Sequence, residues 1–236
     1  MTLFASALAA ATLEQTGARP LRGTWITNVA SSALRSESEV KDAIKICLDN
    51  KINTVFVVVW NKGLTMFPSD VMEKYIGVRQ DPVYKGFDPL ACMVKEGHEA
   101  GIEVHAWFEF GFSYKNGSSE SVWEAKYPHW IGRKSGRRTL EKNGFYWWNA
   151  LHPKPQQFLK DLITEVVRKY PVDGIQGDDR LPAMPSEGGY DAFTSELYRR
   201  EKGVNPPSNH LDPEWVQWRA DKLSEFGRSI YRTVKE

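Results

Sequence analysis

The sequence has little of several features that mark particular classes of protein. It contains two cysteines, Cys47 and Cys92, and no CxxC or Cys/His cluster of the kind that holds zinc. We expect both to be buried thiols in helices. The 31 lysines and arginines nearly balance the 30 aspartates and glutamates, so no broad positive field attracts nucleic acid or an anionic membrane. No apolar run is long enough to span a bilayer.

Motifs for nucleotides and metals are also missing. No GxGxxG follows the first predicted strand and no GxxxxGK[ST] occurs, so neither a dinucleotide fold nor a P-loop is supported. No spaced His/Asp motif indicates a metal site. The sequence therefore predicts no cofactor, no metal and no nucleic-acid partner.

The first 20 residues differ from the rest of the chain. A small, apolar run from Leu3 to Ala11 resembles the core of a secretory signal, with Ala7-Leu8-Ala9 as a cleavage site. No positive charges precede it, and the alternative is a frayed helix. We expect residues 1–20 to be a signal remnant and linker, and residues 21–236 to form one domain. On this basis we expect the protein to be exported to the periplasm or cell envelope.

Strand and helix patterns alternate along residues 21–236. The β-branched run TVFVVV is typical of a strand buried on both faces. Strands are expected at 22–29, 53–60, 103–112 and 172–179, and helices at 36–51, 88–101, 154–171, 191–203 and 212–236. Such alternation predicts an α/β fold with a parallel sheet.

The loops point to a barrel. The segments 61–87 and 113–153 follow strands and far exceed the ~2–6 residues usual for such connections. Active sites of (β/α)8 TIM barrels lie on the loops that follow strands, and a whole barrel takes ~250 residues. We therefore expect a TIM-barrel type fold of which about four βα units, the N-terminal half, are present. Its open sheet edges at the first and fourth strands favour self-association.

Alternation along two strands places acidic side chains on one face. Glu109 shares a face with His105 and Trp107, and Asp178 shares a face with Gln176. Because barrel strands pack apolar side chains outward, this set should point inward. Strands are ~4.8 Å apart, so the two carboxylates are expected ~5–10 Å apart. That range spans the ~5–5.5 Å of retaining and the ~6.5–9.5 Å of inverting glycosidases.

Cleavage of a glycosidic bond needs such a pair. One carboxyl group protonates the leaving oxygen, and an ionised one acts as nucleophile or base. Like charges at close range push their pKa values apart, which supplies one of each. We predict Glu109 and Asp178 as catalytic residues, with Arg180 beside them. Asp179 either joins them or caps the next segment.

Aromatic and amide side chains near the strand ends suit sugar binding, although each could instead pack within a loop. The predicted substrate-binding residues are Trp25, Asn28, Trp60, Asn61, Trp107, Trp148, Asn149 and Arg180. The basic stretch GRKSGRR, residues 132–138, is either a solvated loop tip or a contact for acidic groups on a substrate.

Two other functions fit the same residues. A metal-dependent hydrolase would use Asp178, Asp179, His105 and His152 as ligands. A non-catalytic glycan-binding module would keep the aromatic side chains and make no use of the acids.

Several segments together resemble the glycosyl-hydrolase-like family ten. They are RGTWITNV, TVFVVVWNKGLTMFPSDV, DPLACMVKEGHEAGIEVHAWFEFGF, NALHPKPQQFLKDLITEVVRKYPVDGIQGDD and WVQWRADKLSEF. The resemblance implies a (β/α)8 barrel and a glycoside hydrolase acting on bacterial peptidoglycan strands. It places Glu109, Asp178 and Asp179 at acidic positions of the family. Where the family commonly reads FDDH, this chain has GDDR, and we expect Gly177 to leave a gap on the outer face.

Overall fold

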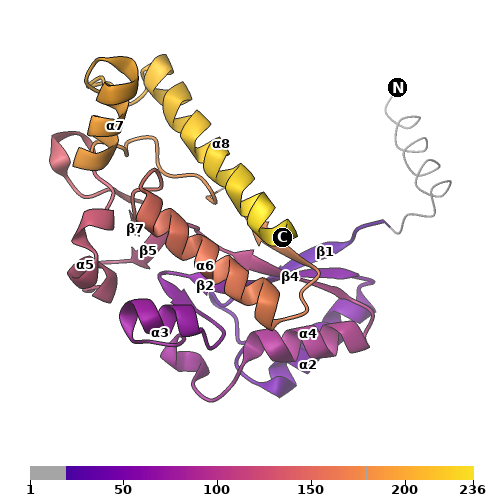
Figure 1. Ribbon diagram of the computed structural model, residues 1–236. Coiled ribbons are helices and arrows are strands. Elements are labelled where there is room, and N and C mark those ends of the chain that lie inside the picture. The colour runs from indigo at the N-terminus through magenta and orange to yellow at the C-terminus, as the bar shows by residue number, and fades with distance from the viewer. Residues whose placement is uncertain (1–19, 179) are drawn as a thin grey trace, which may run out of the picture.

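A four-stranded parallel sheet organises the fold. The computed structural model describes residues 20–178 and 180–236 (Figure 1), so the signal-like run and Asp179 lie outside the described residues. The strand order is β1-β2-β4-β8, with β1 at Gly23–Ile26, β2 at Thr54–Asn61, β4 at Glu103–Phe108 and β8 at Gly174–Gly177. All four predicted strands are present. Three of them, β1, β4 and β8, are shorter than expected, because the chain leaves the sheet after Ile26, Phe108 and Gly177.

Five long helices follow the predicted pattern. They are α2 (Glu37–Asp49), α4 (Pro89–Glu99), α6 (Pro153–Lys169), α7 (Ala192–Lys202) and α8 (Pro213–Lys235). Each begins at a side chain that accepts a hydrogen bond from the first turn; these caps are Ser36, Asp88, His152, Asp191 and Asp212. Helix α4 packs on β2 and β4, α2 packs beside α4, and α6 packs beside α8 (Figure 1). Cys47 is buried in α2 as expected, whereas Cys92 in α4 is only partly buried.

One face of the sheet lies under these helices, and the other is concave. On the helix side, Val55 and Val104 are fully buried. On the concave side, the indole Nε1 of Trp25 in β1 donates a 3.0 Å hydrogen bond to Oε1 of Gln176 in β8. These strands stand three positions apart, which would be about 14 Å in a flat sheet. Their contact shows that the sheet curves as a barrel wall does.

A row of ring side chains lines the concave face. Strand pairing aligns Trp25, Phe56, His105 and Gly174 across β1, β2, β4 and β8. Trp25 stacks on Phe56 with ring centroids 5.1 Å apart, and Phe56 lies 5.2 Å from His105. A Cβ at Gly174 would come within 2.4 Å of His105 Nδ1, so the missing side chain makes room for the imidazole. Such layers of inward side chains are typical of barrel interiors.

Both long loops carry secondary structure that the sequence did not predict. The loop after β2 holds β3 (Leu64–Thr65), α3 (Asp70–Ile76) and a 3₁₀ turn at Pro82–Tyr84. The loop after β4 holds β5 (Ser113–Asn116), α5 (Val122–Lys126), 3₁₀ turns at Pro128–Trp130 and Ser135–Arg137, β6 (Glu141–Lys142) and β7 (Phe145–Trp147). Strands β5, β7 and β6 form a small antiparallel sheet.

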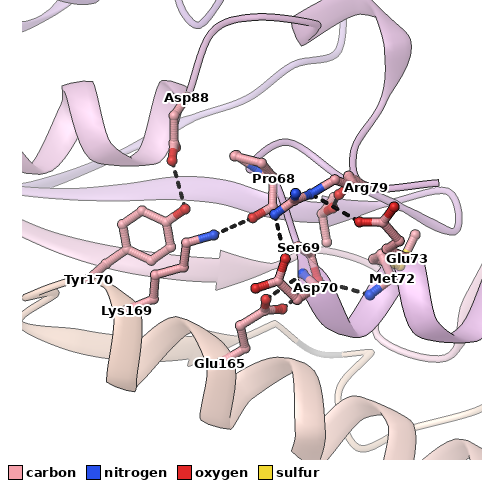
Figure 2. Close-up of polar contacts among 11 residues, drawn as sticks. Pro68, Ser69, Asp70, Met72, Glu73, Arg79, Asp88, Glu165, Lys169 and Tyr170 are labelled. Carbon is pink, nitrogen blue, oxygen red and sulfur yellow. Dashed lines mark hydrogen bonds and ion pairs between the residues drawn. The ribbon is translucent and has the colours of Figure 1, made fainter. Parts of the chain in front are cut away.

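A polar brace ties the first loop to α6 (Figure 2). The carboxylate of Glu165 accepts hydrogen bonds from the Ser69 hydroxyl and from the backbone N–H of Asp70, the latter at 2.6 Å. Lys169 donates to the carbonyl oxygen of Pro68 at 2.5 Å. Because Ser69 also caps α3, the brace fixes the start of that helix against α6.

Among the described residues, no helix combines the length and the apolar character needed to cross a bilayer. Strands β1 and β8 are the outer strands of the main sheet as described. Self-association through them stays a prediction.

Candidate active site

An irregularity in strand pairing sets the directions of Trp60 and Asn61. The register between β2 and β4 runs regularly up to Val58 opposite Trp107 and then shifts, so that Trp60 stands opposite Phe108. The shift turns Trp60 to the helix side, where it is completely buried. Asn61 consequently points to the concave side. Bulges next to active sites commonly redirect a side chain in this way.

Glu109 follows β4 directly and is the central acidic residue of the site. Its side chain is buried, and its Oε2 accepts a 2.8 Å hydrogen bond from Nδ2 of Asn61. Burial, and then the charge of Asp178, raise the pKa of Glu109 to about 7, while Arg180 and Lys62 act in the opposite direction. Glu109 can therefore hold a proton near neutral pH.

Asp178 follows β8 and is held by three donors. Its Oδ1 accepts from the backbone N–H of Arg180 at 2.9 Å. Its Oδ2 accepts from the Arg180 guanidinium at 3.2 Å and from the backbone N–H of Phe110 at 3.4 Å. The pairing of Phe108 with Gly177 brings Glu109 and Asp178 to the ends of adjacent strands. The structure thus brings the predicted pair together.

The two strand ends approach each other closely through backbone. Phe110 and Gly111 both have positive φ, 60° and 44°. A Cβ added to Gly111 would lie 2.6 Å from the carbonyl oxygen of Arg180, so only glycine fits there. On the outer face, a Cβ at Gly177 would lie 2.9 Å from the carbonyl oxygen of Leu181. Leu181 covers Gly177 closely, yet the expected gap is present on this face, where Gly177 and Leu181 line a hollow of about 310 Å³ together with residues of α8.

A hollow of about 320 Å³ lies beside Phe110 and Arg180, which both donate hydrogen bonds to Asp178. Its lining includes Phe110, Lys142, Phe145, Trp147, Arg180 and Met184. Phe110 and Phe145 stack with ring centroids 4.1 Å apart, and the Arg180 guanidinium lies 4.0 Å from the Phe110 ring centroid. Trp147 is buried, and its indole N–H has no acceptor among the described residues. Aromatic faces with an unused donor suit a sugar ring.

Three predicted substrate contacts are wrong because they are core residues. Trp60 donates to the carbonyl oxygen of Gly111 at 2.8 Å, deep among aromatic rings. Trp148 is also fully buried in this aromatic cluster. Asn149 donates to Thr194 at 2.8 Å and accepts from the N–H of Leu151 at 3.0 Å, so its amide is used inside the protein.

The remaining predicted residues that the structure describes lie on the concave side or at the pair. Trp25 is half exposed, Trp107 is buried with an unpartnered indole N–H, and Asn28 accepts a 3.0 Å hydrogen bond from Asn61. Asp179 lies outside the described residues. Sequence reasoning missed Phe110 and Phe145 as lining residues, since only the positive φ of Phe110 and the hairpin of β6 and β7 bring their rings together.

The residues of the metal-dependent alternative have separate surroundings. His105 lies against Phe56 in the concave row, whereas His152 caps α6 and lies against Phe193. Across residues 20–178 and 180–236, no group of three or more His, Cys, Asp or Glu side chains is arranged to hold a metal ion.

Comparison with known proteins finds similar sequences among glycosyl hydrolases. The glycosyl hydrolase DigH of Escherichia coli K12 is 27% identical over 256 residues, which cover 94% of this chain and 53% of DigH. The glycosyl hydrolase YngK of Bacillus subtilis is 27% identical over 235 residues, covering 92% of this chain and 42% of YngK. The chain thus spans about half the length of these relatives.

A solved structure shows the same fold over part of its length. The α-L-fucosidase isoenzyme 2 of Paenibacillus thiaminolyticus superposes with a TM-score of 0.63 at 20% identity, over 92% of this chain and 31% of the fucosidase. The parallel β/α sheet therefore matches a glycosidase over part of that protein's length. The model of the glycosyl hydrolase-like 10 family matches residues 20–236, and the chain belongs to this family.

Proposed function

We propose that this chain carries the carboxylate pair of a glycoside hydrolase that cleaves O-glycosidic bonds in a cell-wall, peptidoglycan-type glycan. The observation that carries the proposal is the environment of Glu109, a buried carboxyl group with a pKa of about 7 next to Asp178. Glu109 is the proton donor to the leaving oxygen, and Asp178 is its carboxylate partner on the adjacent strand.

The hydrogen bonds at the pair support these roles. Asp178 faces a guanidinium and two backbone N–H groups, which suit a negative charge. Glu109 receives one neutral donor, Asn61, and is otherwise buried. Two carboxyl groups in such different surroundings suit the two roles in a glycosidase, a protonated acid and an ionised carboxylate.

Unused polar atoms support a glycan as the ligand. Asn61 Oδ1 and Trp147 Nε1 are buried without a partner among the described residues. Leaving such atoms unpaired costs about 1–3 kcal/mol each, and sugar hydroxyls can supply both a donor and an acceptor. The stacked Phe110 and Phe145 offer an apolar wall in the hollow that Trp147 also lines.

The test is release of reducing ends from peptide-free peptidoglycan strands. It uses the longest chain that the native reading frame encodes, with Glu109→Gln and Asp178→Asn as variants. Glu103→Gln is the matched control, because Glu103 is exposed at the start of the same strand. We expect each site variant to lose about 100-fold or more of the rate and the control to keep it.

Two results would contradict the assignment. Wild-type turnover in Asp178→Asn excludes Asp178 from the chemistry. Glycan binding without turnover in every form, including wild type, indicates a binding module instead. For wild type, the rate should fall as pH rises through about 7, because Glu109 then loses its proton.

The cell envelope is the proposed location, supported by the apolar run Leu3–Ala11. Fractionation of cells that express the native reading frame tests this. Recovery of the protein only in the cytoplasm contradicts it.

A further inference from the structure

A second hollow shares no lining residue with the one beside Phe110. It lies between the loop after β4 and the first turns of α6 and α7, and its volume is about 600 Å³. Ligand pockets are commonly about 300–1,000 Å³. The side chains considered below are His129, Arg133, Arg137, His152, Asp191 and Phe193.

Two arginines line this hollow, and neither pairs with a carboxylate among the described residues. Arg133 donates a 3.0 Å hydrogen bond to the hydroxyl of Thr139, and Arg137 forms no hydrogen bond or ion pair within the described part of the chain. Both belong to the basic stretch GRKSGRR. Its lysine, Lys134, differs from them because it faces the carboxylate of Glu141 at 3.9 Å. Guanidinium groups of this kind suit a carboxylate or phosphate.

The two helix caps add a donor and an acceptor. His152 accepts the N–H of Lys154 at Nδ1 (3.1 Å), so its neutral ring carries the hydrogen on Nε2. Asp191 accepts the N–H of Thr194 at Oδ1 (2.9 Å), while its Oδ2 is buried with no donor among the described residues. A sugar hydroxyl can donate to Asp191 and accept from His152.

The remaining features favour a ring that carries negative charge. Phe193 is 37% exposed, and its ring lies 4.6 Å from that of His152, which gives an apolar surface for a sugar ring. Helix α6, of 17 residues, begins at this hollow with His152 as its cap and has no acidic residue in its first turn. Its positive end adds to the field of the arginines, whereas the carboxylate of Asp191 caps α7.

We propose that this hollow binds a sugar unit that carries an anionic group, a carboxylate or a phosphate. Arg133 and Arg137 contact the anion, His152 and Asp191 contact hydroxyls, and Phe193 packs on the ring. The proposal rests on the proposed function in taking the ligand to be part of a glycan. It gives the enzyme a binding site for an anionic unit of the same strand, separate from the carboxylate pair.

Binding of three matched sugars tests the proposal without any need for turnover. The probes are N-acetylmuramic acid, N-acetylglucosamine 6-phosphate and neutral N-acetylglucosamine, titrated by NMR or calorimetry into the native chain. We expect at least one anionic sugar to bind several-fold more tightly than the neutral one. Preference for the first assigns a carboxylate, and preference for the second assigns a phosphate.

Variants test which side chains cause the preference for anionic sugars. Arg137→Gln, at an exposed position, should weaken anionic binding about 2- to 5-fold, and Arg133→Gln with Arg137→Gln about 10-fold, with little change for the neutral sugar. Arg138→Gln is the matched control, since Arg138 is exposed in the same loop but does not line the hollow. Thermal melting confirms folding, and Arg137→Gln alone suffices if the double variant is unstable.

The outcomes separate this proposal from the first. Equal binding of the three sugars, no binding of any of them, or an equal loss in Arg138→Gln overturns it. Asp178→Asn should keep the anionic preference. If that variant also keeps the hydrolysis rate, the proposed function fails while the binding site stands.

Discussion

Asn61 donates a 2.8 Å hydrogen bond to Glu109 across the ends of β2 and β4. A neutral donor favours the ionised carboxylate, so the bond opposes the burial that raises the pKa of Glu109. In Asn61→Leu the pKa of Glu109 should rise further, by about 0.5–1 unit. The pKa of Glu109 can be measured from the fall of the hydrolysis rate at alkaline pH (the alkaline limb of the pH–rate profile) or by NMR titration of labelled glutamate. Asn28→Ala keeps the Asn61–Glu109 bond and should leave that limb in place.

Glu109→Gln should change how stability depends on pH. The pKa of Glu109 is raised from 4.5 to about 7 in the folded chain, so its ionisation disfavours folding. Its contribution is fully present below pH 4.5 and is lost as pH rises through about 7. Relative to Glu109→Gln, wild type should lose about 2–3 kcal/mol of unfolding free energy between pH 5 and pH 8. Urea unfolding at the two pH values measures this, and parallel curves would contradict the burial of Glu109.

Arg180→Gln removes a cation that lowers the pKa of Glu109 and partners Asp178. The pKa of Glu109 should therefore rise by about one unit, and the alkaline limb of the rate should follow it. Arg180→Lys is the matched control because it keeps the positive charge. The same shift in both variants would show that charge is not the cause.

Trp60→Phe tests whether Trp60 is structural. The change removes the 2.8 Å hydrogen bond to Gly111 and leaves space among the rings around it. We expect a loss of about 2–4 kcal/mol in unfolding free energy and no change in KM. Trp25→Phe, on the half-exposed concave side, should cost less stability. A raised KM with unchanged stability in Trp60→Phe would restore it as a substrate contact.

Glu165→Ala removes the two carboxylate acceptors of the brace between the first loop and α6 and leaves the bond from Lys169 to Pro68 (Figure 2). Ser69 is completely buried and would lose one partner, so we expect a loss of about 1–3 kcal/mol in unfolding free energy. Gln157→Ala, at an exposed position of the same helix, is the control and should change little. Equal melting of the two variants would show that the brace adds no stability.

The main sheet could be predicted because its strands carry a strong signal. The run TVFVVV in β2 is β-branched and continuous, and the long helices have clear caps. The small antiparallel sheet could not, since β5, β6 and β7 have four, two and three residues and no lasting alternation. Such short strands depend on tertiary contacts rather than on local preference.

The candidate site could be predicted where the strands pair regularly, and not where their pairing shifts. Regular alternation correctly directs Glu109 toward the concave side, because β4 is regular up to Phe108. It fails at Trp60, where the register shift after Val58 reverses the direction of the following side chains. A bulge depends on how two strands pair, and the sequence of one strand does not reveal it.

The backbone contact at Gly111 sets how closely the ends of β4 and β8 approach each other. The strand ends that carry Glu109 and Asp178 touch where a Cβ would lie only 2.6 Å from the Arg180 carbonyl oxygen. Retaining and inverting glycosidases differ by only about 1–4 Å in carboxylate separation. A methyl group at position 111 would clash with the carbonyl oxygen of Arg180 and push the two strand ends apart. Gly111→Ala is thus the smallest substitution that would change how closely the strand ends that carry Glu109 and Asp178 approach each other.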